Sequence, residues 1–401
     1  MLRSLFSGIS GLKAHQTMLD VAGNNIANVN TTGFKSSQTQ FQDTLSQVLT
    51  NAGAAAPGVG GTNPAQVGLG VRVAGITTNF SQGAAQLTNR STDMMINGDG
   101  FFTLRSGNEQ FFTRAGSFNF DSLGQLVTPD GALVQGWAAV DGVVNPNGPL
   151  TDIKLPISTL MGAEATKTAT YVGNLPSDAL DGSAPLVKSI DVYDSLGNTR
   201  SLKLTFTKAA GDWSVAATDG TATFPVAPAT GLVTFDPATG AILTPTTFTI
   251  GTAPDDVAVD LSALTGFAGL STVAAVAQDG QGAGNLQSFS LSPDGTLLGS
   301  FSNGLKQAIG QLSMATFTNP TGLEKAGGSM YRTTVSSGIA QVGVAGTGGR
   351  GKLAGGSLEM SNVDLSAEFT NLIIAQRGFQ ANSRVITTSD ELLQELVNLK
   401  R

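Results

Sequence analysis

The chain has 401 residues, no cysteine and a single histidine, His15. Without cysteine, the chain can form no disulfide framework, no thiolate nucleophile and no thiolate metal site. A Ser-His-Asp triad would have to use His15, and a metal site with several histidine ligands is excluded because the chain has no second histidine. His15 lies one residue from the apolar seam of a predicted helix, so we interpret it as a packing or solvent-facing residue. We therefore expect no enzyme activity and no catalytic, cofactor-binding or metal site.

Charge is also scarce, because only 13% of the residues are charged. Lys and Arg number 22 against 29 for Asp and Glu, which gives a net charge of -7. Such a chain has no basic field to attract phosphates, so nucleic acid and anionic membranes are not expected partners. No stretch approaches the roughly 18 apolar residues of a membrane-spanning helix, so membrane insertion is not expected either. The N-terminal apolar run is broken by Gly8, Gly11 and Lys13, and it predicts no cleaved signal peptide.

Two patterns resemble binding motifs by their letters but lack the necessary context. Residues 346–351 read GTGGRG, like a dinucleotide fingerprint, yet the residues that follow do not open a helix. We interpret this segment as a linker. Residues 191–202 have the length and acidic start of a calcium loop but no terminal glutamate. They predict a hairpin turn instead.

The two ends of the chain are predicted to be helical. Apolar residues recur there at spacings of three and four, which is typical of an amphipathic helix with a narrow seam. The first helix should end near 28–33, where asparagines and a glycine gather, and the second should run from about 365 to 398 with Asp364 or Ser361 as its cap. The predicted assembly seam comprises Leu5, Ile9, Leu12, Leu19 and Ile26 in the first helix, and Leu365, Phe369, Leu372, Phe379, Ile386 and Leu393 in the second.

A helix of that length, about 50 Å at 1.5 Å per residue, cannot bury its apolar stripe in a small domain alone. Its natural partner is the helix at the other end of the chain, in an antiparallel, coiled-coil-like pair. Ile373, Ile374, Val385 and Leu392 lie off the main seam, so two helices leave apolar surface uncovered. Other copies of the same chain could cover it, and the pattern predicts a homopolymer.

The middle of the chain is predicted to be antiparallel β structure, so the fold class is α+β. Short alternating runs such as SLKLTF at 201–206 are separated by turn sequences, and Gly-, Ala- and Pro-rich segments at 51–66 and 338–357 are typical of connectors with little intrinsic order. From about 146 to 283, Thr, Ala and Pro become more frequent. The predicted division is a helical domain (1–28 and 365–401), a connecting region (29–75 and 338–364), a β domain (76–145 and 284–337) and a second β domain inserted into it (146–283).

Both ends carry sequences that resemble the signatures of the flagellar rod and hook family. Residues 24–35 read NNIANVNTTGFK, residues 361–365 read SNVDL, and residues 376–383 read QRGFQANS. Two specific motifs occur in order at opposite ends of the chain, which makes a chance match negligible. The positions that match the family motifs are Asn24, Asn25, Asn28, Gly33, Phe34, Asn362, Asp364, Gln376 and Arg377.

The middle of the chain indicates which kind of member it resembles. The segments INGDGFF at 96–102 and TRAGSF at 113–118 are shared by hook and distal rod subunits, whereas VYDSLGN at 192–198, SNG at 302–304 and ATFTNPTGLE at 315–324 resemble hook subunits more closely. Rod subunits also lack a large insertion like 146–283. A distal rod subunit remains the alternative. A secreted carbohydrate-binding or hydrolytic β protein would leave the helical ends unexplained.

The resemblance implies a structural subunit of a flexible curved tube that acts as a universal joint between rod and filament. It implies that the terminal helices line the inner wall of the tube and that the β domains form its outer layers. Such subunits leave the cell through the flagellar type III export apparatus without signal cleavage, and they polymerise beneath a hook cap. The implied neighbours are the distal rod and the hook-filament junction proteins, the implied location is the extracellular hook of the flagellum, and no cofactor is implied.

Overall fold

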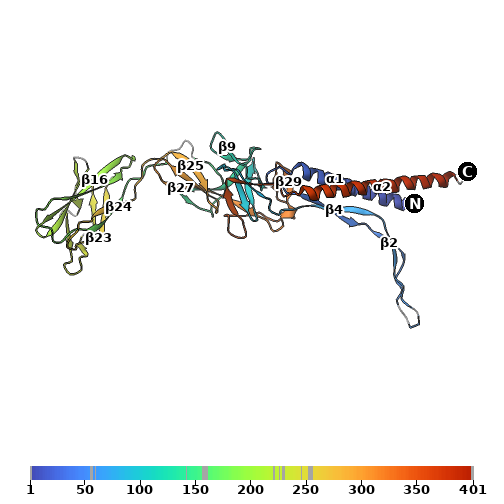
Figure 1. Cartoon of the computed structure of the whole chain (residues 1–401), viewed down its shortest axis with the longest axis horizontal. Helices are drawn as coiled ribbons and strands as arrows, with labels where there is room; N and C mark the ends of the chain where they lie inside the picture. The colour runs from blue at the N-terminus through green and yellow to red at the C-terminus, as the bar shows by residue number, and fades with distance from the viewer. Residues whose placement is uncertain are drawn as a thin grey trace. The chain divides into compact units, whose positions relative to one another are not determined.

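The computed structural model of the chain describes residues 2–54, 57–58, 60–140, 142–155, 161–219, 222–224, 226–227, 231–244, 246–251 and 256–398 (Figure 1). Residues 1 and 399–401 of the predicted helical domain lie outside this described part. The chain divides into two compact units, of which unit 1 comprises Met1–Leu155, Phe289–Leu298 and Ala308–Arg401 and unit 2 comprises Pro156–Ser288 and Gly299–Gln307. The four-part division expected from the sequence stays a prediction.

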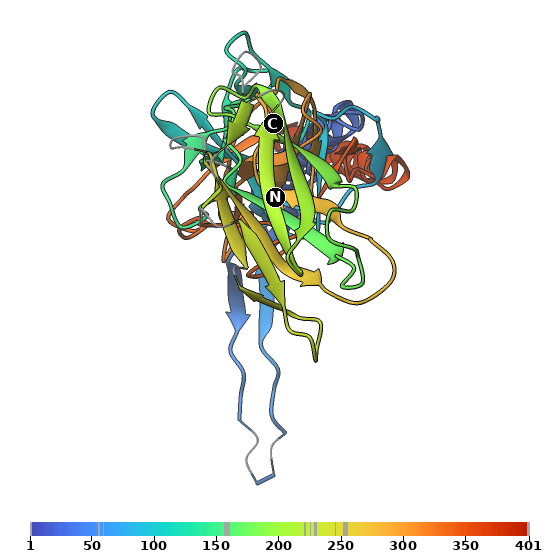
Figure 2. The ribbon, with the colours of Figure 1, turned by 90° about the vertical axis from the view of Figure 1, so that its left-hand side faces the viewer.

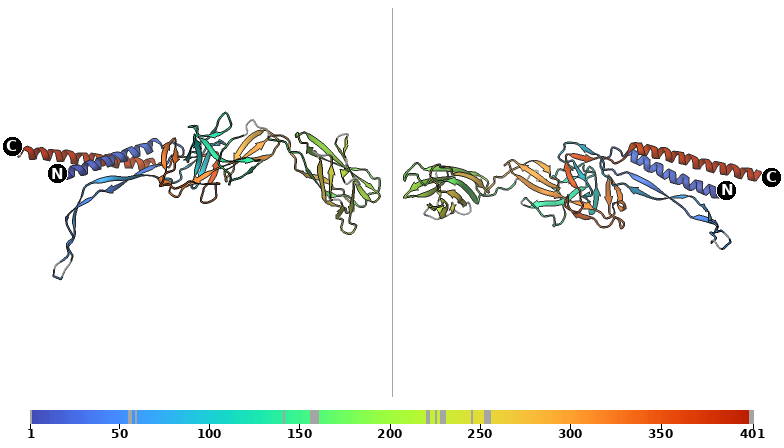
Figure 3. Two further views of the ribbon diagram at one scale, coloured as in Figure 1. Left: turned by 180° about the vertical axis from the view of Figure 1, so that it is seen from behind. Right: turned by 60° about the horizontal axis from the view of Figure 1, so that its bottom comes forward.

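Unit 1 contains both helices, α1 (Leu2–Ala27) and α2 (Leu365–Asn398), which pack side by side and run in opposite directions (Figure 3). The helical ends predicted from the periodicity are therefore confirmed. Asp364 caps α2, because its Oδ1 accepts hydrogen bonds from the backbone N–H groups of Ser366 (2.8 Å) and Ala367 (3.2 Å). Neither helix, over its described length, has an apolar stretch long enough to cross a bilayer.

Small residues make the closest contacts between the two helices. A Cβ added to Gly8 would lie 3.3 Å from Ile386, and one added to Gly11 would lie 2.7 Å from Asn382. Ala14, Ala22 and Ala375 are fully buried beside them. These small side chains allow the helix axes to approach closely, and the larger residues of the predicted seam lie to either side of them. Ile9, Leu365 and Phe369 are exposed, and the half-buried members are Leu5, Leu12, Leu19, Ile26, Leu372, Phe379, Ile386 and Leu393.

A long hairpin follows α1. Its near half, β1 (Ser37–Asp43) and β4 (Val71–Thr78), packs against α1, with the ring of Phe41 5.7 Å from that of His15. Its far half, β2 (Ser46–Thr50) and β3 (Ala65–Gly68), is exposed at every residue and projects away from the sheets of unit 1 (Figure 2). The described part of the connector predicted at 51–66 forms the end of this hairpin.

The remaining strands of unit 1 form one large sheet and two small pairs. In the large sheet, β11 and β8 flank β7, and rings pack edge to face in the core, as for Phe101 of β7 against Tyr331 of β30 at 5.9 Å and for Phe112 of β8 against Phe317, which follows β28, at 4.9 Å. The two small pairs are β5 with β33 and β6 with β32. The bounds are β5 (Ala85–Leu87), β6 (Met94–Asn97), β7 (Phe101–Ser106), β8 (Glu109–Thr113), β9 (Asn119–Phe120), β10 (Leu126–Val127), β11 (Leu133–Val140), β12 (Val143–Val144), β13 (Thr151–Asp152), β28 (Met314–Thr316), the 3-10 helix η1 (Pro320–Gly322), β29 (Glu324–Gly327), β30 (Met330–Arg332), β31 (Gln341–Gly343), β32 (Lys352–Gly355) and β33 (Ser357–Glu359).

The segment 338–357 is thus not the poorly ordered linker that its composition suggested. It contains β31 and β32 and begins β33, each of which pairs with a strand from a distant part of the chain. The guanidinium of Arg350 fixes the intervening loop by donating to the carbonyl of Val344 at 2.9 Å. Backbone pairing and this bond supply the order that the glycines lack.

Unit 2 consists of two sheets that share one apolar core, with the indole of Trp213 and the rings of Tyr171, Phe206 and Phe248 at its centre (green and yellow in Figure 2). The pairing is antiparallel except between β14 and β23.

The turn predicted within 191–202 is confirmed, since Asp194 accepts a hydrogen bond from the backbone N–H of Asn198 at 2.8 Å. The bounds are β14 (Thr168–Asn174), β15 (Leu186–Tyr193), β16 (Thr199–Ala209), β17 (Asp212–Asp219), β18 (Ala222–Phe224), β19 (Val226–Ala227), β20 (Leu232–Phe235), β21 (Ile242–Thr244), β22 (Thr247–Ile250), β23 (Val257–Thr265) and β24 (Ala274–Gln278), while β25 (Leu286–Leu291), β26 (Thr296–Phe301) and β27 (Lys306–Leu312) cross the limits of the units.

The far half of the hairpin should open readily in the free chain. An isolated two-stranded ribbon with no buried face is marginally stable at best. We expect amides of β2 and β3 to exchange with solvent faster than those of Phe101–Leu104 in β7, which are fully buried, by roughly two orders of magnitude or more. Hydrogen exchange measured by mass spectrometry on dilute chain tests this expectation. Equal protection in both regions would contradict it.

Two helix glycines should respond in opposite ways to alanine. A Cβ on Gly378 would lie 2.5 Å from the His15 ring, which Phe41 already confines, whereas a Cβ on Gly23 would meet nothing within 4 Å. Gly378→Ala should lower the free energy of unfolding of the helix pair by about 1 to 3 kcal/mol. Gly23→Ala should raise it by about 0.5 to 1 kcal/mol. Thermal melts followed by far-ultraviolet circular dichroism measure both changes, and an equal gain from the two variants would show that the helices do not pack in this way.

Candidate functional site

The segment that leaves α1 and the segment that enters α2 lie together in unit 1. Asn25 is completely buried and joins them. Its Nδ2 donates to the carbonyl of Ser37 at 2.7 Å and to Oε1 of Glu368 at 2.9 Å, while its Oδ1 accepts from the backbone N–H of Ser37 at 3.0 Å. One amide side chain thus connects α1, β1 and α2.

Asn24 and Asn28 close the end of α1. Nδ2 of Asn28 donates to the carbonyl of Asn24 at 2.9 Å, and the hydroxyl of Thr31 donates to Oδ1 of Asn28 at 3.0 Å. These bonds satisfy backbone and side-chain groups where the helix stops. The chain then turns toward the sheets.

Gly33 makes this turn possible. Its φ is +67°, a left-handed conformation that other residues seldom adopt, and its N–H donates to the carbonyl of Glu359 at 2.8 Å. A Cβ at this position would collide with the backbone of Arg114 and Ala115. Glycine is therefore required for two independent reasons, the dihedral angle and the close approach of another backbone segment.

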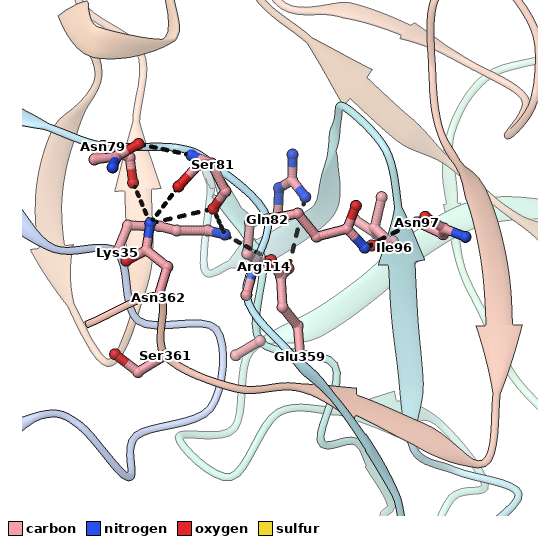
Figure 4. A network of polar contacts seen from close by, with 12 residues as sticks. Lys35, Asn79, Ser81, Gln82, Ile96, Asn97, Arg114, Glu359, Ser361 and Asn362 are labelled. Carbon is pink, nitrogen blue, oxygen red and sulfur yellow. Dashed lines mark hydrogen bonds and ion pairs between the residues drawn. The ribbon is translucent and has the colours of Figure 1, made fainter. Parts of the chain in front are cut away.

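Directly after the turn lies a buried ionic network, in which Lys35, Arg114 and Glu359 take part (Figure 4). The ammonium of Lys35 donates to Oε1 of Glu359 at 2.6 Å and to the carbonyl of Ser81 at 2.7 Å. Arg114 Nη1 lies 3.5 Å from Oε2 of Glu359, and the three side chains are 0%, 2% and 0% exposed for Lys35, Arg114 and Glu359 respectively. The backbone N–H of Gly83 also donates to Oε1 at 2.9 Å.

Burial dominates the electrostatics of this network. Loss of water lowers the pKa of Lys35, and the hydrogen bond and charge of Glu359 act in the opposite direction. Burial likewise lowers the pKa of Arg114, against the attraction of Glu359 and Asp99. Two cations therefore share one buried carboxylate, and each of them is costly to bury without it.

Asn362 and Phe34 complete the junction. Oδ1 of Asn362 accepts from the backbone N–H of Ser36 at 2.8 Å, and its Nδ2 donates to the carbonyl of Asn79 at 2.8 Å (Figure 4). The ammonium of Lys325 lies 5.0 Å from the centre of the Phe34 ring. We call this region, from Asn24 to Ser37 and from Glu359 to Glu368 with Arg114, the junction.

The structure gathers most of the predicted motif residues at the junction and leaves two outside it. Asn24, Asn25, Asn28, Gly33, Phe34, Asn362 and Asp364 belong to it. Gln376 and Arg377 are exposed on α2. Sequence reasoning missed Glu359 as the shared partner of Lys35 and Arg114, and no local signal could reveal it, since Lys35 and Glu359 are 324 positions apart.

Removal of the shared carboxylate should destabilise unit 1 strongly. Glu359→Gln keeps the shape but leaves Lys35 and Arg114 buried without a counter-charge, and we expect a loss of about 3 to 5 kcal/mol in the free energy of unfolding. The matched control is Glu324→Gln, which removes the carboxylate of an exposed pair with Arg332 and should change little. Denaturant unfolding compares the two, and similar losses from both variants would refute a special role for the buried pair.

Models of known families match the chain in four places. The model of the flagella basal body rod protein matches residues 5–35, and that of the flagellar hook protein FlgE/F/G D1 domain matches residues 95–167. The model of the flagellar basal body protein FlaE D2 domain matches residues 166–281. The C-terminal model of the flagellar basal body rod FlgEFG protein matches residues 354–399.

Full-length relatives agree with these matches. The chain is 40% identical to the flagellar hook protein FlgE of Treponema pallidum over 100% of both chains, and 36% identical to that of Salmonella typhimurium over 99% of this chain and 100% of the relative. It is 35% identical to the flagellar basal-body rod protein FlgG of Bacillus subtilis over 100% of both. The crystal structure of the Helicobacter pylori flagellar hook protein FlgE2 has a similar fold, with a TM-score of 0.53 at 14% identity over 69% of this chain and 100% of that one. The chain belongs to the family of flagellar hook and basal-body rod proteins.

Proposed function

We propose that this chain is the structural subunit of the flagellar hook. It self-assembles through its terminal helices into a flexible, curved tube that transmits torque from the rod to the filament. Full-length identity to proteins named as hook subunits supports the proposal, as does a helix pair with large apolar residues on its outside. The role that we propose for the chain is structural, not catalytic.

The exposed apolar residues of the helix pair carry the assembly proposal. Phe6 is 63% exposed, Phe369 51% and Ile373 55%. Full burial of each of these side chains would contribute about 1.5 to 3 kcal/mol of favourable free energy. Soluble monomers rarely leave such a row of residues in water. Neighbouring copies that pack their own helices against this surface would bury it, and the helices would then form the inner wall of the tube.

Bending requires contacts between copies that break and form again once in each turn of the tube. A surface with few charges suits this requirement, because desolvated ion pairs are costly to separate. The chain has only 13% charged residues. Apolar contacts between helices are non-directional, so they tolerate small displacements along the helix axis. The subunit can therefore hold its neighbours firmly without fixing one spacing.

The same proposal covers export and the remaining partners. The chain leaves the cell through the flagellar type III export apparatus without cleavage of a signal peptide, and it polymerises beneath a hook cap. The ends of the tube adjoin the distal rod and the hook-filament junction proteins. The absence of cysteine suits export as an unfolded chain, because no disulfide has to be reduced.

The Bacillus subtilis relative named as a rod protein keeps one alternative open, a distal rod subunit. Both kinds of subunit form tubes, but a rod is stiff and straight. The match of residues 166–281 to a D2 domain model supports the hook. Electron microscopy of assembled tubes distinguishes the two, because hooks are curved and rods are not.

A charge on the outer surface of α2 should block assembly without disturbing the fold. In the double variant Phe369→Asp and Ile373→Asp, two exposed residues become carboxylates that a neighbouring copy would have to bury. We expect the concentration needed for polymerisation to rise at least about tenfold, with an unchanged thermal melt of the monomer. Electron microscopy and sedimentation of full-length chain measure assembly.

The control places the same chemical change in unit 2. Leu180 is 80% exposed, so Leu180→Asp alters an accessible apolar residue that belongs to unit 2 and not to the helices. This variant should form tubes at the concentration that the unchanged chain requires. Normal tubes from the double variant would contradict assembly through this surface of α2.

A further inference from the structure

A small pocket of about 270 Å³ opens beside the junction, between the segment that follows α1 and the turn that joins β29 to β30. Asn28, Thr31 and Phe34 form one side, and Met330 and Tyr331 form part of the other. Lys325 is the only charged residue among those that line the pocket. The pocket therefore has mostly apolar walls and one cation.

The ammonium of Lys325 is held in place. It lies over the Phe34 ring, donates to the hydroxyl of Ser37 at 2.9 Å and approaches the carbonyl of Lys35 at 3.4 Å. A lysine that only solvated the surface would not need three contacts with one neighbouring segment. These contacts fix the cation at the edge of the pocket before anything binds there.

Among the residues that the structure describes, the charge of Lys325 has no partner of opposite sign. No carboxylate in the described part of the chain forms an ion pair with it, in contrast to Lys35 with Glu359 and Arg332 with Glu324. Asp130 reaches the same turn, where it lies against Gly328, but it does not pair with Lys325. Partial burial lowers the pKa of Lys325, and no acidic group opposes that shift. An incoming carboxylate would therefore find a positioned, partly desolvated donor.

A second copy of the chain is the partner that fits. In the proposed function the chain assembles with copies of itself, and each copy carries 29 acidic residues against 22 basic ones, so carboxylates are in excess. Asn28, which lines the pocket, directly follows α1, and in the last turn of that helix Asn25 donates to Glu368 of α2, near the exposed Leu365 and Phe369. A neighbour that covers this end of the helix pair comes within reach of Lys325.

We propose that the pocket at Lys325 receives an aspartate or glutamate side chain from a second copy of this chain in the assembled tube. The inference rests on the proposed function, because it describes a contact between polymerised subunits. It assigns to Lys325 a contact that adds to the apolar contacts between helices. Its chemistry is a charge-assisted hydrogen bond beside Phe34 and Tyr331, and because Lys325 is an exposed residue this bond can break and form again as the tube bends.

Carbodiimide cross-linking tests this contact directly. The reagent joins an amine to a touching carboxylate through an amide bond, and the oxygen that the carboxylate loses leaves as the urea. Tubes assembled from an equal mixture of ¹⁴N- and ¹⁵N-labelled full-length chains should yield a cross-linked peptide that pairs Lys325 of one label with an acidic residue of the other. Dilute monomer should not yield it. Mass spectrometry identifies the acidic residue.

Two variants separate the charge from the amine. Lys325→Arg keeps the charge but cannot form the amide, so it should assemble normally and lose the cross-link. Lys325→Met keeps the stem without the charge, and the concentration needed for assembly should rise roughly tenfold. Lys306→Met, at an exposed lysine of unit 2, is the matched control and should change nothing.

The possible results distinguish this inference from the function on which it rests. Tubes in which Lys325 forms no cross-link, or only one within its own chain, would refute the proposed contact. The proposal that the chain is a hook subunit would still stand. Normal assembly of Lys325→Met would have the same meaning. A full-length chain that forms no tubes at any concentration would overturn both.

Discussion

The carboxylate of Glu359 connects three parts of the chain that are far apart in sequence. It is buried between Lys35, which follows α1, and Arg114, which belongs to the β structure of unit 1, and Glu359 itself lies just before α2. A buried charge is costly unless its partners are in place, so this network is stable only when all three segments have arrived. The exit of α1, the turn at Gly33 and the start of α2 all depend on it, since each lies within a few residues of one member.

This constraint fixes one end of the helix pair and leaves the rest to weaker contacts. Near the junction, Asn25 bonds to both β1 and α2. Farther along, the contact is made by glycines and alanines, which bring the helices close but bury little apolar area themselves. Large side chains such as Phe369 and Ile373 therefore remain on the outside. The subunit thus has a rigid base and a helical surface whose stability depends on neighbours.

Local sequence patterns predicted both helices, the limits of α2, and Asp364 as one of two candidate caps, because these features depend on residues only a few positions apart. Features that depend on distant residues could not be predicted. The pairing of Lys35 with Glu359 has no local signal, and the strands within 338–357 exist only because other segments pair with them. The seam was predicted from large apolar residues, but Gly8, Gly11 and Gly378 also lie where the two helices approach each other closely, and glycine is unfavourable inside a helix on propensity alone.

The two kinds of lysine at the junction show how the chain divides its interactions between folding and assembly. Lys35 is satisfied within the chain by Glu359, and so it contributes to the fold of each copy. Lys325 is held in place, but no carboxylate in the described part of the chain pairs with it, and Phe369 is apolar but exposed. A subunit that satisfied every charge and buried every apolar side chain internally would gain no free energy on polymerising. On the proposed function, neighbouring copies cover the apolar side chains that α2 leaves exposed, while the buried network ensures that each copy presents them in the same geometry.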